Sequence, residues 1–462
     1  MKIATSLVAA LLLSSALYAR GQEPPLSCSP APCVLPTVQV SEGGNAVTEA
    51  SITVNPLNSS DFLVAAQDGN CPFGFGFPMG VYASSNGGSS WSPPHCMLPV
   101  YTYSPSVYPT VGFDRTGAAY LEGVYASNNN YLLSLLAFEK STQGSNWSNP
   151  APNVAASSEP VDDRLAVDTN ATSPHVNSVY VSYADGLTGI GGVSVQLRVT
   201  HSSDGGKTWI TSAVTHQLLH SDTAFSNMTF GKDGTIYLAW LYCAETGTLC
   251  DNHGTTAYMV LSISSDGGNT WSTPRHLATV TLAPCSCGPY GILPNTSAAV
   301  SNFPVIGVDN SVGPNAGSLY VVMYNWTGTY MQVEVIHSKD GGNTWSKPVP
   351  VAPVTATHDQ FLAWLSVSST GAVGVSWLDR RNDPANLSYQ PFAAVSTDGG
   401  KTFGTNWELS SAFSNPLNDG SGGHYLGDYT SNVWVGSTLY AVWMDTSNGL
   451  SSQDVIGGLR LK

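Results

Sequence analysis

The chain has 462 residues, which is long enough for two or three average domains or for one large repeat architecture. Only 10% of its residues are charged, against about 25% in a typical soluble domain. Its 46 glycines, 29 prolines and 21 tyrosines favour the repeat architecture, built from short strands and many turns. A net charge of −15 argues against a nucleic-acid partner and suits an extracellular protein.

The first residues have the pattern of a secretory signal peptide. Lys2 supplies a positive charge, and the apolar run over residues 4–17 is short for a bilayer span. Ala19 and Gly21 place small residues where a signal peptidase reads them. We expect residues 1–21 to be removed and the mature chain, without a membrane span, to be secreted or periplasmic. An uncleaved membrane anchor is the alternative.

Eight cysteines agree with export. They fall as near neighbours in the chain, which predicts the local pairs Cys28/Cys33, Cys71/Cys96, Cys243/Cys250 and Cys285/Cys287. The last pair would close a strained ring, so its two members are also candidates for pairing elsewhere. No C-x-x-C pair occurs, which favours structural disulfides over a zinc site.

One octapeptide with the consensus S-x-D-G-G-x-T-W recurs along the chain. Its copies span residues 202–209, 264–271 and 338–345, with looser copies at 84–91 and 396–403 and a decayed one at 141–147. The Ser and Asp side chains suit hydrogen bonds to turn amides, and the Gly-Gly pair provides positions with positive φ. The terminal aromatic side chain is expected to pack the hairpin onto its neighbour.

A second repeat is independent of the first. An apolar, aromatic segment lies upstream of every box, and seven such segments recur at intervals of roughly sixty residues, a length that suits a four-stranded propeller blade. They are Phe62–Asp68, Ala119–Tyr125, Val179–Asp185, Ile236–Tyr242, Leu319–Asn325, Val373–Asp379 and Leu439–Asp445. Another strand precedes each of them, so the unit reads strand A, strand B, strand C, box, strand D.

The last unit stops early, and this predicts how the ring closes. Residues 454–461 supply its third strand, and Thr37–Val40 can supply the missing outer strand. Closure removes exposed sheet edges. We therefore expect residues 22–36 to form an N-terminal extension and residues 37–462 to form a single all-β propeller. Seven four-stranded antiparallel blades are favoured, and six follow if only the boxes are counted.

The strand order predicts which residues share the mouth of the propeller. Starts of A strands and ends of B strands lie on one face, and the boxes lie on the other. The mouth then collects Glu49, Tyr108, Asp162–Arg164, Asp222, Asn302, His358–Gln360, His424, Asp428–Tyr429, Asp68, Asp185, Asn325, Asp379–Arg381 and Asp445. Polar groups at a ring centre suit a binding pocket. The alternative is that they cap strands and bridge blades.

The boxes, the repeat unit and the signal sequence resemble the BNR/Asp-box, sialidase-like superfamily over nearly the whole mature chain. Residues 49–56, 163–168, 427–429 and 442–445 look like secreted bacterial proteins often labelled exo-α-sialidase. Such glycoside hydrolases use three arginines to hold a carboxylate, a Tyr nucleophile activated by Glu, and an Asp acid/base. The Arg-Ile-Pro motif expected near the N-terminus is missing here.

Carried onto this chain, the resemblance implies that Tyr429 attacks with help from Glu49 while Asp163 serves as acid/base. The remaining expected site residues bind substrate, and they are Arg164, Arg380, Asp359 and Asp428. A glycan or glycoconjugate is the expected ligand and a monomer the expected state.

Two alternatives stay open. The first is a non-catalytic propeller that binds glycan or protein at the same mouth. The second is calcium binding, because oxygen-rich clusters suit this ion. Its candidate ligands are Asp162, Asp222, Asp359 and Asp428. No other cofactor and no other metal site is expected.

Overall fold

The computed structural model describes most of the chain after the predicted signal peptide. The described residues are 24–72, 78–128, 133–154, 159–189, 192–215, 218–219, 222–243, 256–284, 290–353, 355, 357–420, 423 and 425–462. The predicted signal peptide, residues 1–21, lies outside them. No helix among the described residues is long and apolar enough to cross a membrane.

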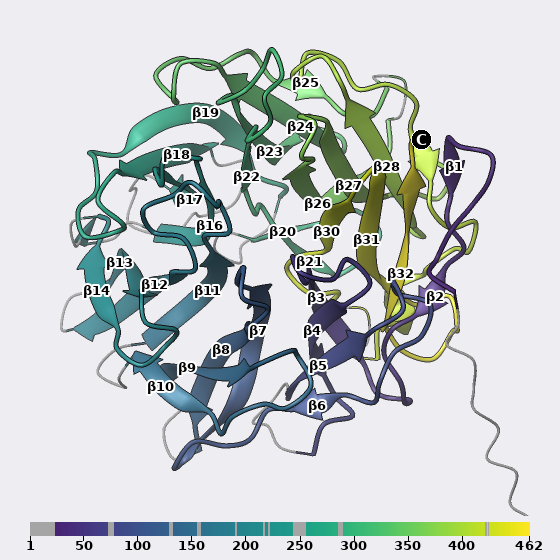
Figure 1. Ribbon diagram of the computed structural model, residues 1–462. Coiled ribbons are helices and arrows are strands. Elements are labelled where there is room, and N and C mark those ends of the chain that lie inside the picture. Colours follow the sequence, from purple (N-terminus) through teal and green to yellow (C-terminus); the bar gives the residue numbers. More distant parts are fainter. Residues whose placement is uncertain are drawn as a thin grey trace, which may run out of the picture.

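Seven antiparallel sheets surround a common axis, each with four strands in the order A to D (Figure 1). Blade one holds β3 (Val47–Val54), β4 (Phe62–Asp68), β5 (Met79–Ser84) and β6 (His95–Cys96). Blade two holds β7 (Tyr103–Phe113), β8 (Ala119–Ser127), β9 (Ser134–Ser141) and β10 (Ala151–Val154). Blade three holds β11 (Glu159–Val167), β12 (Val179–Gly189), β13 (Gly192–Ser202) and β14 (Ile210–Ala213), with β15 (Leu218–Leu219) beside β13.

The other blades repeat this order. Blade four holds β16 (Asp222–Phe230), β17 (Ile236–Cys243), β18 (Thr256–Ser264) and β19 (Arg275–Thr281), and the pair β20 (Tyr290–Ile292) and β21 (Ala299–Ser301) follows it. Blade five holds β22 (Val305–Val308), β23 (Leu319–Trp326), β24 (Met331–Ser338) and β25 (Val349–Pro350). Blade six holds β26 (Gln360–Val367), β27 (Val373–Asp379), β28 (Gln390–Ser396) and β29 (Trp407–Glu408). Blade seven holds β30 (Ser431–Val435), β31 (Thr438–Asp445), β32 (Gln453–Arg460), β1 (Cys33–Val34) and β2 (Val38–Gln39).

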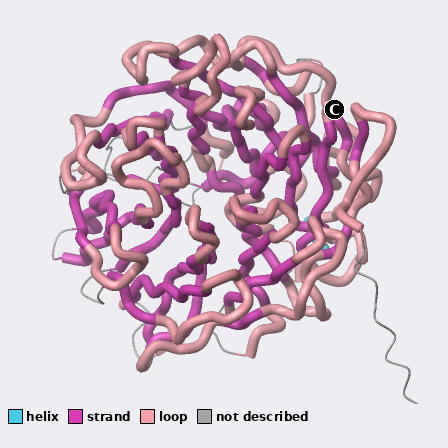
Figure 2. Tube along the Cα trace, in the orientation of Figure 1, coloured by secondary structure: helices cyan, strands magenta, loops and turns pink. Residues whose placement is uncertain are grey.

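The predicted repeat is confirmed. All seven expected B strands are present, and β4 and β27 have the expected bounds. Every side chain of these two strands is buried, because both faces of a blade pack against neighbouring blades. The alternative of six blades, counted from the boxes, is wrong because blade seven lacks a box and still forms a sheet. Figure 2 shows strands arranged around the axis and joined by loops. Among the described residues the one helix is the short η1 (Pro416–Asn418).

The two ends of the described chain close the ring. The predicted strand Thr37–Val40 appears as β2, in which Val38 pairs with Ile456 of β32. The strand β1, in which Cys33 pairs with Arg460, was not predicted. Figure 1 shows β1 and β32 side by side at the outer edge of blade seven. Blades one and seven also pack through their aromatic side chains, since the rings of Phe62 and Tyr440 lie 5.0 Å apart.

The octapeptides form the expected hairpin turns. In the box of blade four, Ser264 donates a hydrogen bond of 2.8 Å to Asp266. Asp266 in turn accepts hydrogen bonds from the backbone N–H groups of Asn269 and Thr270 at 3.1 and 2.9 Å. Both glycines of every recognisable box have positive φ. The aspartate side chain therefore stabilises its own turn by hydrogen bonding. This structural role explains why the aspartate recurs, and no ligand is needed to explain it.

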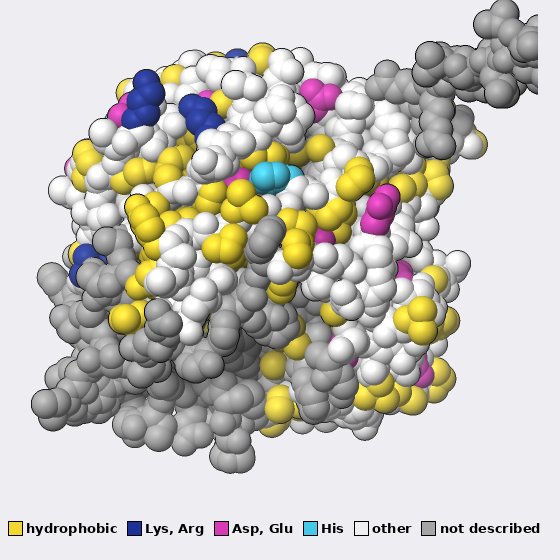
Figure 3. All heavy atoms as spheres, turned by 90° about the horizontal axis from the view of Figure 1, so that it is seen from below, with side chains coloured by type: hydrophobic (Ala, Val, Ile, Leu, Met, Phe, Trp, Pro, Cys, Tyr) yellow, Lys and Arg dark blue, Asp and Glu magenta, His cyan; other side chains and the backbone are white. Residues whose placement is uncertain are grey.

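The disulfides agree with an oxidising, extracellular-type environment. The predicted pairs Cys28–Cys33 and Cys71–Cys96 are present. Cys243 is also disulfide-bonded. The other three cysteines of the predicted pairs lie outside the described residues. The rim of the disc carries few charged side chains in Figure 3, as the composition requires.

Candidate functional site

A β-bulge recurs near the start of the innermost strand. In five blades the A–B register shifts there, and the first bulged residue has positive φ although it is not glycine. These residues are Glu49, Tyr108, Asp162, Phe225 and Leu362. A non-glycine residue in this conformation costs of order 1–3 kcal/mol, and such residues gather at functional sites. The bulges therefore mark the mouth end of the axis as a place to seek function.

At the axis, a guanidinium lies among aromatic rings. The central carbon of the Arg164 guanidinium is 3.7 Å from the ring centre of Tyr429, and 4.9 and 5.2 Å from those of Phe303 and Trp364. Arg164 is only 3% exposed, and none of its guanidinium nitrogens has a hydrogen-bond partner among the described residues. Cation–π attraction therefore holds this charge in place.

The hydroxyl group of Tyr429 is directed to the backbone. It donates a hydrogen bond of 3.0 Å to the carbonyl oxygen of Pro109. Burial raises the pKa of this phenol well above its ordinary value, and the nearby charge of Arg164 opposes that rise. The structure thus brings the predicted residues Tyr429 and Arg164 together at the axis, with the phenol held by main chain.

Glu49 is the most heavily bonded carboxyl of the site. It accepts hydrogen bonds from the side chain of Gln67 at 2.6 Å, from the backbone N–H of Tyr108 at 3.1 Å and from the hydroxyl of Tyr425. Burial raises its pKa to about 7. The carboxyl of Asp428, raised well above its ordinary pKa by burial and then by the charge of Glu49, hydrogen bonds with it. The pair therefore retains a proton near neutral pH.

A second carboxyl pair lies beside the same guanidinium. Burial raises the pKa of Asp163 to about 6, and burial together with Asp163 raises that of Glu122 well above its ordinary value. The two carboxyls hydrogen bond with each other, and Asp163 also accepts from its own backbone N–H. One proton shared between them satisfies both groups. Glu122 was not anticipated, although an acidic residue within an apolar strand was a visible signal.

The other predicted arginine is used within the protein. Arg380 forms a fully buried ion pair with Asp359 at 3.1 Å, and it also donates to the carbonyl oxygens of Pro294 and Asn386. Its neighbour Arg381 pairs with Asp379 at 2.5 Å. In the described part of the chain, Arg164, Arg380 and Arg381 do not converge into a three-arginine grip. Two of the expected substrate-binding residues, Arg380 and Asp359, bind each other.

A cavity of about 320 Å³ opens at the mouth end of blade one. Gln67 and Tyr425, the two side chains that donate to Glu49, both line it, as do Thr48, Asp68 and Asp419. The buried carboxyl of Glu49 therefore lies one hydrogen bond behind the cavity wall. Tyr425 was not predicted as a site residue, because the segment around it has no strand periodicity.

The calcium alternative gains no support within the described ranges. No group of three or more His, Cys, Asp or Glu side chains is placed there to hold a metal ion. Asp359 is occupied by Arg380 and by the side-chain amide of Asn386, at 2.8 Å. The side chains of Asp222 and His424 lie outside the described residues.

No protein-family model matches the chain, and no curated protein matches it. Among solved structures, an ulvan lyase of polysaccharide lyase family PL25 aligns with a TM-score of 0.53 and 11% identity, over 92% of this chain and 96% of that chain. An α-L-arabinanase from Penicillium chrysogenum aligns at 0.49 and 12% identity, over 92% and 98%. A leech intramolecular trans-sialidase aligns at 0.42 and 12% identity, over 91% and 68%.

At such identities the likeness to the lyase shows the fold alone. Fold and site together define the class: a seven-bladed, disulfide-bonded β-propeller with repeated Ser/Asp turns and a buried acidic and aromatic centre. Beside its mouth lies the cavity next to Glu49.

Proposed function

We propose that the protein is a secreted propeller that acts on glycans in the mouth cavity, with Tyr425 and Glu49 as its reactive pair. The observation that carries this proposal is the hydrogen bond from the Tyr425 hydroxyl to the buried Glu49 carboxylate at the cavity wall. A nucleophile within hydrogen-bonding reach of a base is the usual signature of covalent catalysis. A Tyr nucleophile is a known exception to the two-carboxylate scheme of glycosidases.

The proposed reaction follows from this pair. Glu49 takes the phenol proton as the Tyr425 oxygen bonds to the anomeric carbon, and the bond from that carbon to the leaving oxygen breaks. The leaving oxygen takes a proton from water in the cavity, because Asp163, the acid/base that the resemblance implies, is 1% exposed and does not line the cavity. Water then cleaves the glycosyl–tyrosine bond and restores both groups.

The lining of the cavity supports a glycan recognised through its hydroxyl groups. Thr48, Gln67, Asp68 and Asp419 line it with a hydroxyl, an amide and two carboxylates. Each is at most 5% exposed, so a sugar hydroxyl would have to enter their existing hydrogen-bond network. An anionic sugar would meet these two carboxylates, and a bidentate arginine contact is what a sialate carboxylate needs. Arg164, the one arginine of the axial cluster, is enclosed by rings.

The experiment is a turnover screen of the mature protein on fluorogenic neutral glycosides and sialosides, run beside a glycan array. Tyr425→Phe should abolish turnover while array binding persists, and Glu49→Gln should reduce both the rate and its pH dependence. Tyr429→Phe is the matched control. Full turnover by a folded Tyr425→Phe variant would refute the proposal. If turnover is lost only in the Tyr429→Phe variant, the nucleophile is Tyr429, the residue implied by the sialidase resemblance.

One observation favours a non-catalytic glycan-binding propeller as the second candidate. Glu49, Asp163, Arg164 and Tyr429 are each at most 3% exposed, which suits a support beneath a binding surface. Array binding without turnover of any glycoside, unchanged in Tyr425→Phe, would support this second function.

A further inference from the structure

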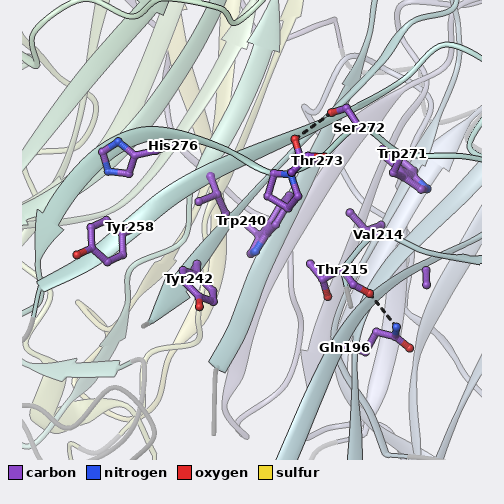
Figure 4. A pocket seen from close by; sticks show the side chains of 13 residues that line it. Gln196, Val214, Thr215, Trp240, Tyr242, Tyr258, Trp271, Ser272, Thr273 and His276 are labelled. Carbon is purple, nitrogen blue, oxygen red and sulfur yellow. Dashed lines mark hydrogen bonds between the residues drawn. The ribbon is translucent and has the colours of Figure 1, made fainter. Parts of the chain in front are cut away.

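A second cavity lies away from the mouth, between blades three and four. Its volume is about 590 Å³, within the range of about 300–1,000 Å³ that small-molecule sites occupy. Blade three contributes Gln196 and residues 213–215, and blade four contributes Trp240, Tyr258 and His276 among others. Among the described residues that line it, none is Asp, Glu, Lys or Arg (Figure 4).

Aromatic side chains form one wall of this cavity. Trp240 and Tyr242 stand two residues apart on β17, so they share one face of the strand. Tyr242 pairs across the sheet with Tyr258, and the ring of Tyr258 meets that of His276 edge-on at 5.3 Å. Tyr242 and Tyr258 are half-buried and His276 is exposed, so ring surface is open to a ligand.

The indole N–H of Trp240 has no hydrogen-bond partner among the described residues, although the side chain is 1% exposed. Blade six shows one way in which the repeat satisfies such a group. Trp377 occupies the same position in its B strand and donates at 2.7 Å to Asp379, two residues further on. In blade four that second position is Tyr242, so the strand supplies no acceptor.

The box of blade four departs from the repeat at the same place. In three other boxes the indole N–H of the terminal Trp donates to the carbonyl of the second glycine. Trp271 donates instead to the hydroxyl of Ser212 in blade three, at 2.9 Å, and that hydroxyl donates to Gly268. Trp271 lines the cavity and links its two walls.

We propose that this cavity binds a neutral saccharide, as a site separate from the mouth. A sugar presents C–H faces to aromatic rings and ring or hydroxyl oxygens to the Trp240 N–H. The side chains of Gln196, Thr215 and Thr273 add polar groups around the rings. The uncharged lining selects against anionic sugars. A purely apolar ligand would leave the Trp240 N–H unpaired.

The test measures binding of cellotetraose, maltotetraose and xylotetraose to the mature protein by calorimetry, and by the indole N–H resonances of protein labelled with ¹⁵N-tryptophan. At least one of these sugars should shift the resonance that disappears in Trp240→Phe. Trp240→Phe should weaken its binding about tenfold, the loss expected for one hydrogen bond. Tyr258→Ala, on the half-buried rim, should weaken it without disturbing the core.

Trp443→Phe is the matched control. Trp443 is equally buried and its indole N–H is also without a partner in the described chain, but the void beside it is only about 10 Å³. The Trp443→Phe variant should bind the sugar as the wild type does. The Tyr425→Phe variant should also bind it, so failure of this proposal can be told apart from failure of the proposed function. No binding of any of the three sugars at about 10 mM would overturn the proposal. Equal affinity of the Trp240→Phe variant and the wild type for the sugar would also overturn it. Binding of decanoate, with no binding of the sugars, would do the same.

Discussion

The free energy of unfolding should fall as the pH rises from 4.5 to 7, because the centre of the propeller buries carboxyl groups in their protonated form. Glu49 ionises near its ordinary pKa of 4.5 in the unfolded chain and near 7 in the folded one. Between these values the folded state binds the additional proton, so raising the pH favours unfolding. The contribution of Glu49 to the free energy of unfolding is complete below pH 4.5 and is lost as the pH rises through 7.

The size of the effect follows from the same values. One pH unit corresponds to about 1.36 kcal/mol, so a rise from 4.5 to about 7 contributes about 3 kcal/mol. Asp163, raised from 3.8 to about 6, contributes a similar amount over a lower range. The box aspartates act in the opposite direction. Hydrogen bonds from the turn help to lower the pKa of Asp266 to about 2, so its contribution is present above 3.8 and is lost on acidification.

Urea denaturation followed by tryptophan fluorescence from pH 4 to pH 8 measures this profile. In the Glu49→Gln variant, the decline of the free energy of unfolding over this pH range should be smaller by about 3 kcal/mol, because the amide does not ionise. Glu42→Gln, an exposed substitution nearby in the chain, should leave the profile unchanged. A wild-type stability that is constant over this range, or an identical decline in Glu49→Gln, would refute the buried-proton account.

Three further predictions concern the fold. Ser264→Ala should cost about 1–2 kcal/mol by releasing the turn of one box, and an unchanged melting temperature would contradict the structural role of the boxes. Gly458→Ala should cost about 1–3 kcal/mol, because a Cβ there would lie 2.3 Å from the carbonyl oxygen of Leu439; calorimetry showing wild-type stability would contradict the tight pairing of β32. Replacing Cys71 and Cys96 by Ser should cost about 2–4 kcal/mol, measured by denaturant midpoint, and a midpoint equal to that of the wild type would show that the crosslink is dispensable.

The fold was predictable because the same pattern of an apolar strand between turns recurs seven times in the sequence. Each B strand is apolar on both faces, and a hairpin turn with its own hydrogen-bonding side chains marks most blades. The strand β1 was missed because Cys33 and Val34 are too few to show a period of two. Its place is fixed by pairing with the far end of the chain, which no local pattern reveals.

The site was predictable as a neighbourhood but not as a set of partners. Strand order alone places Glu49, Arg164 and Tyr429 near the axis, where the structure has them. The partner of Glu49 is nevertheless Tyr425, and Arg164 contacts rings in place of the carboxylate beside it in the chain. A bulge exchanges the face on which each later side chain lies, so the sequence period does not tell which groups meet.

The proton count of the centre bears on the kind of ligand that the mouth accepts. Four buried carboxyls, Glu49, Asp428, Glu122 and Asp163, face the single guanidinium of Arg164. With one proton held by each pair, two negative charges remain against one positive charge. An anion entering the mouth cavity would add to this excess and would have to bring a further proton with it. A glycan read through its hydroxyl groups meets no such requirement, because it accepts hydrogen bonds from Gln67 and donates them to Asp68 and Asp419 without changing the charge.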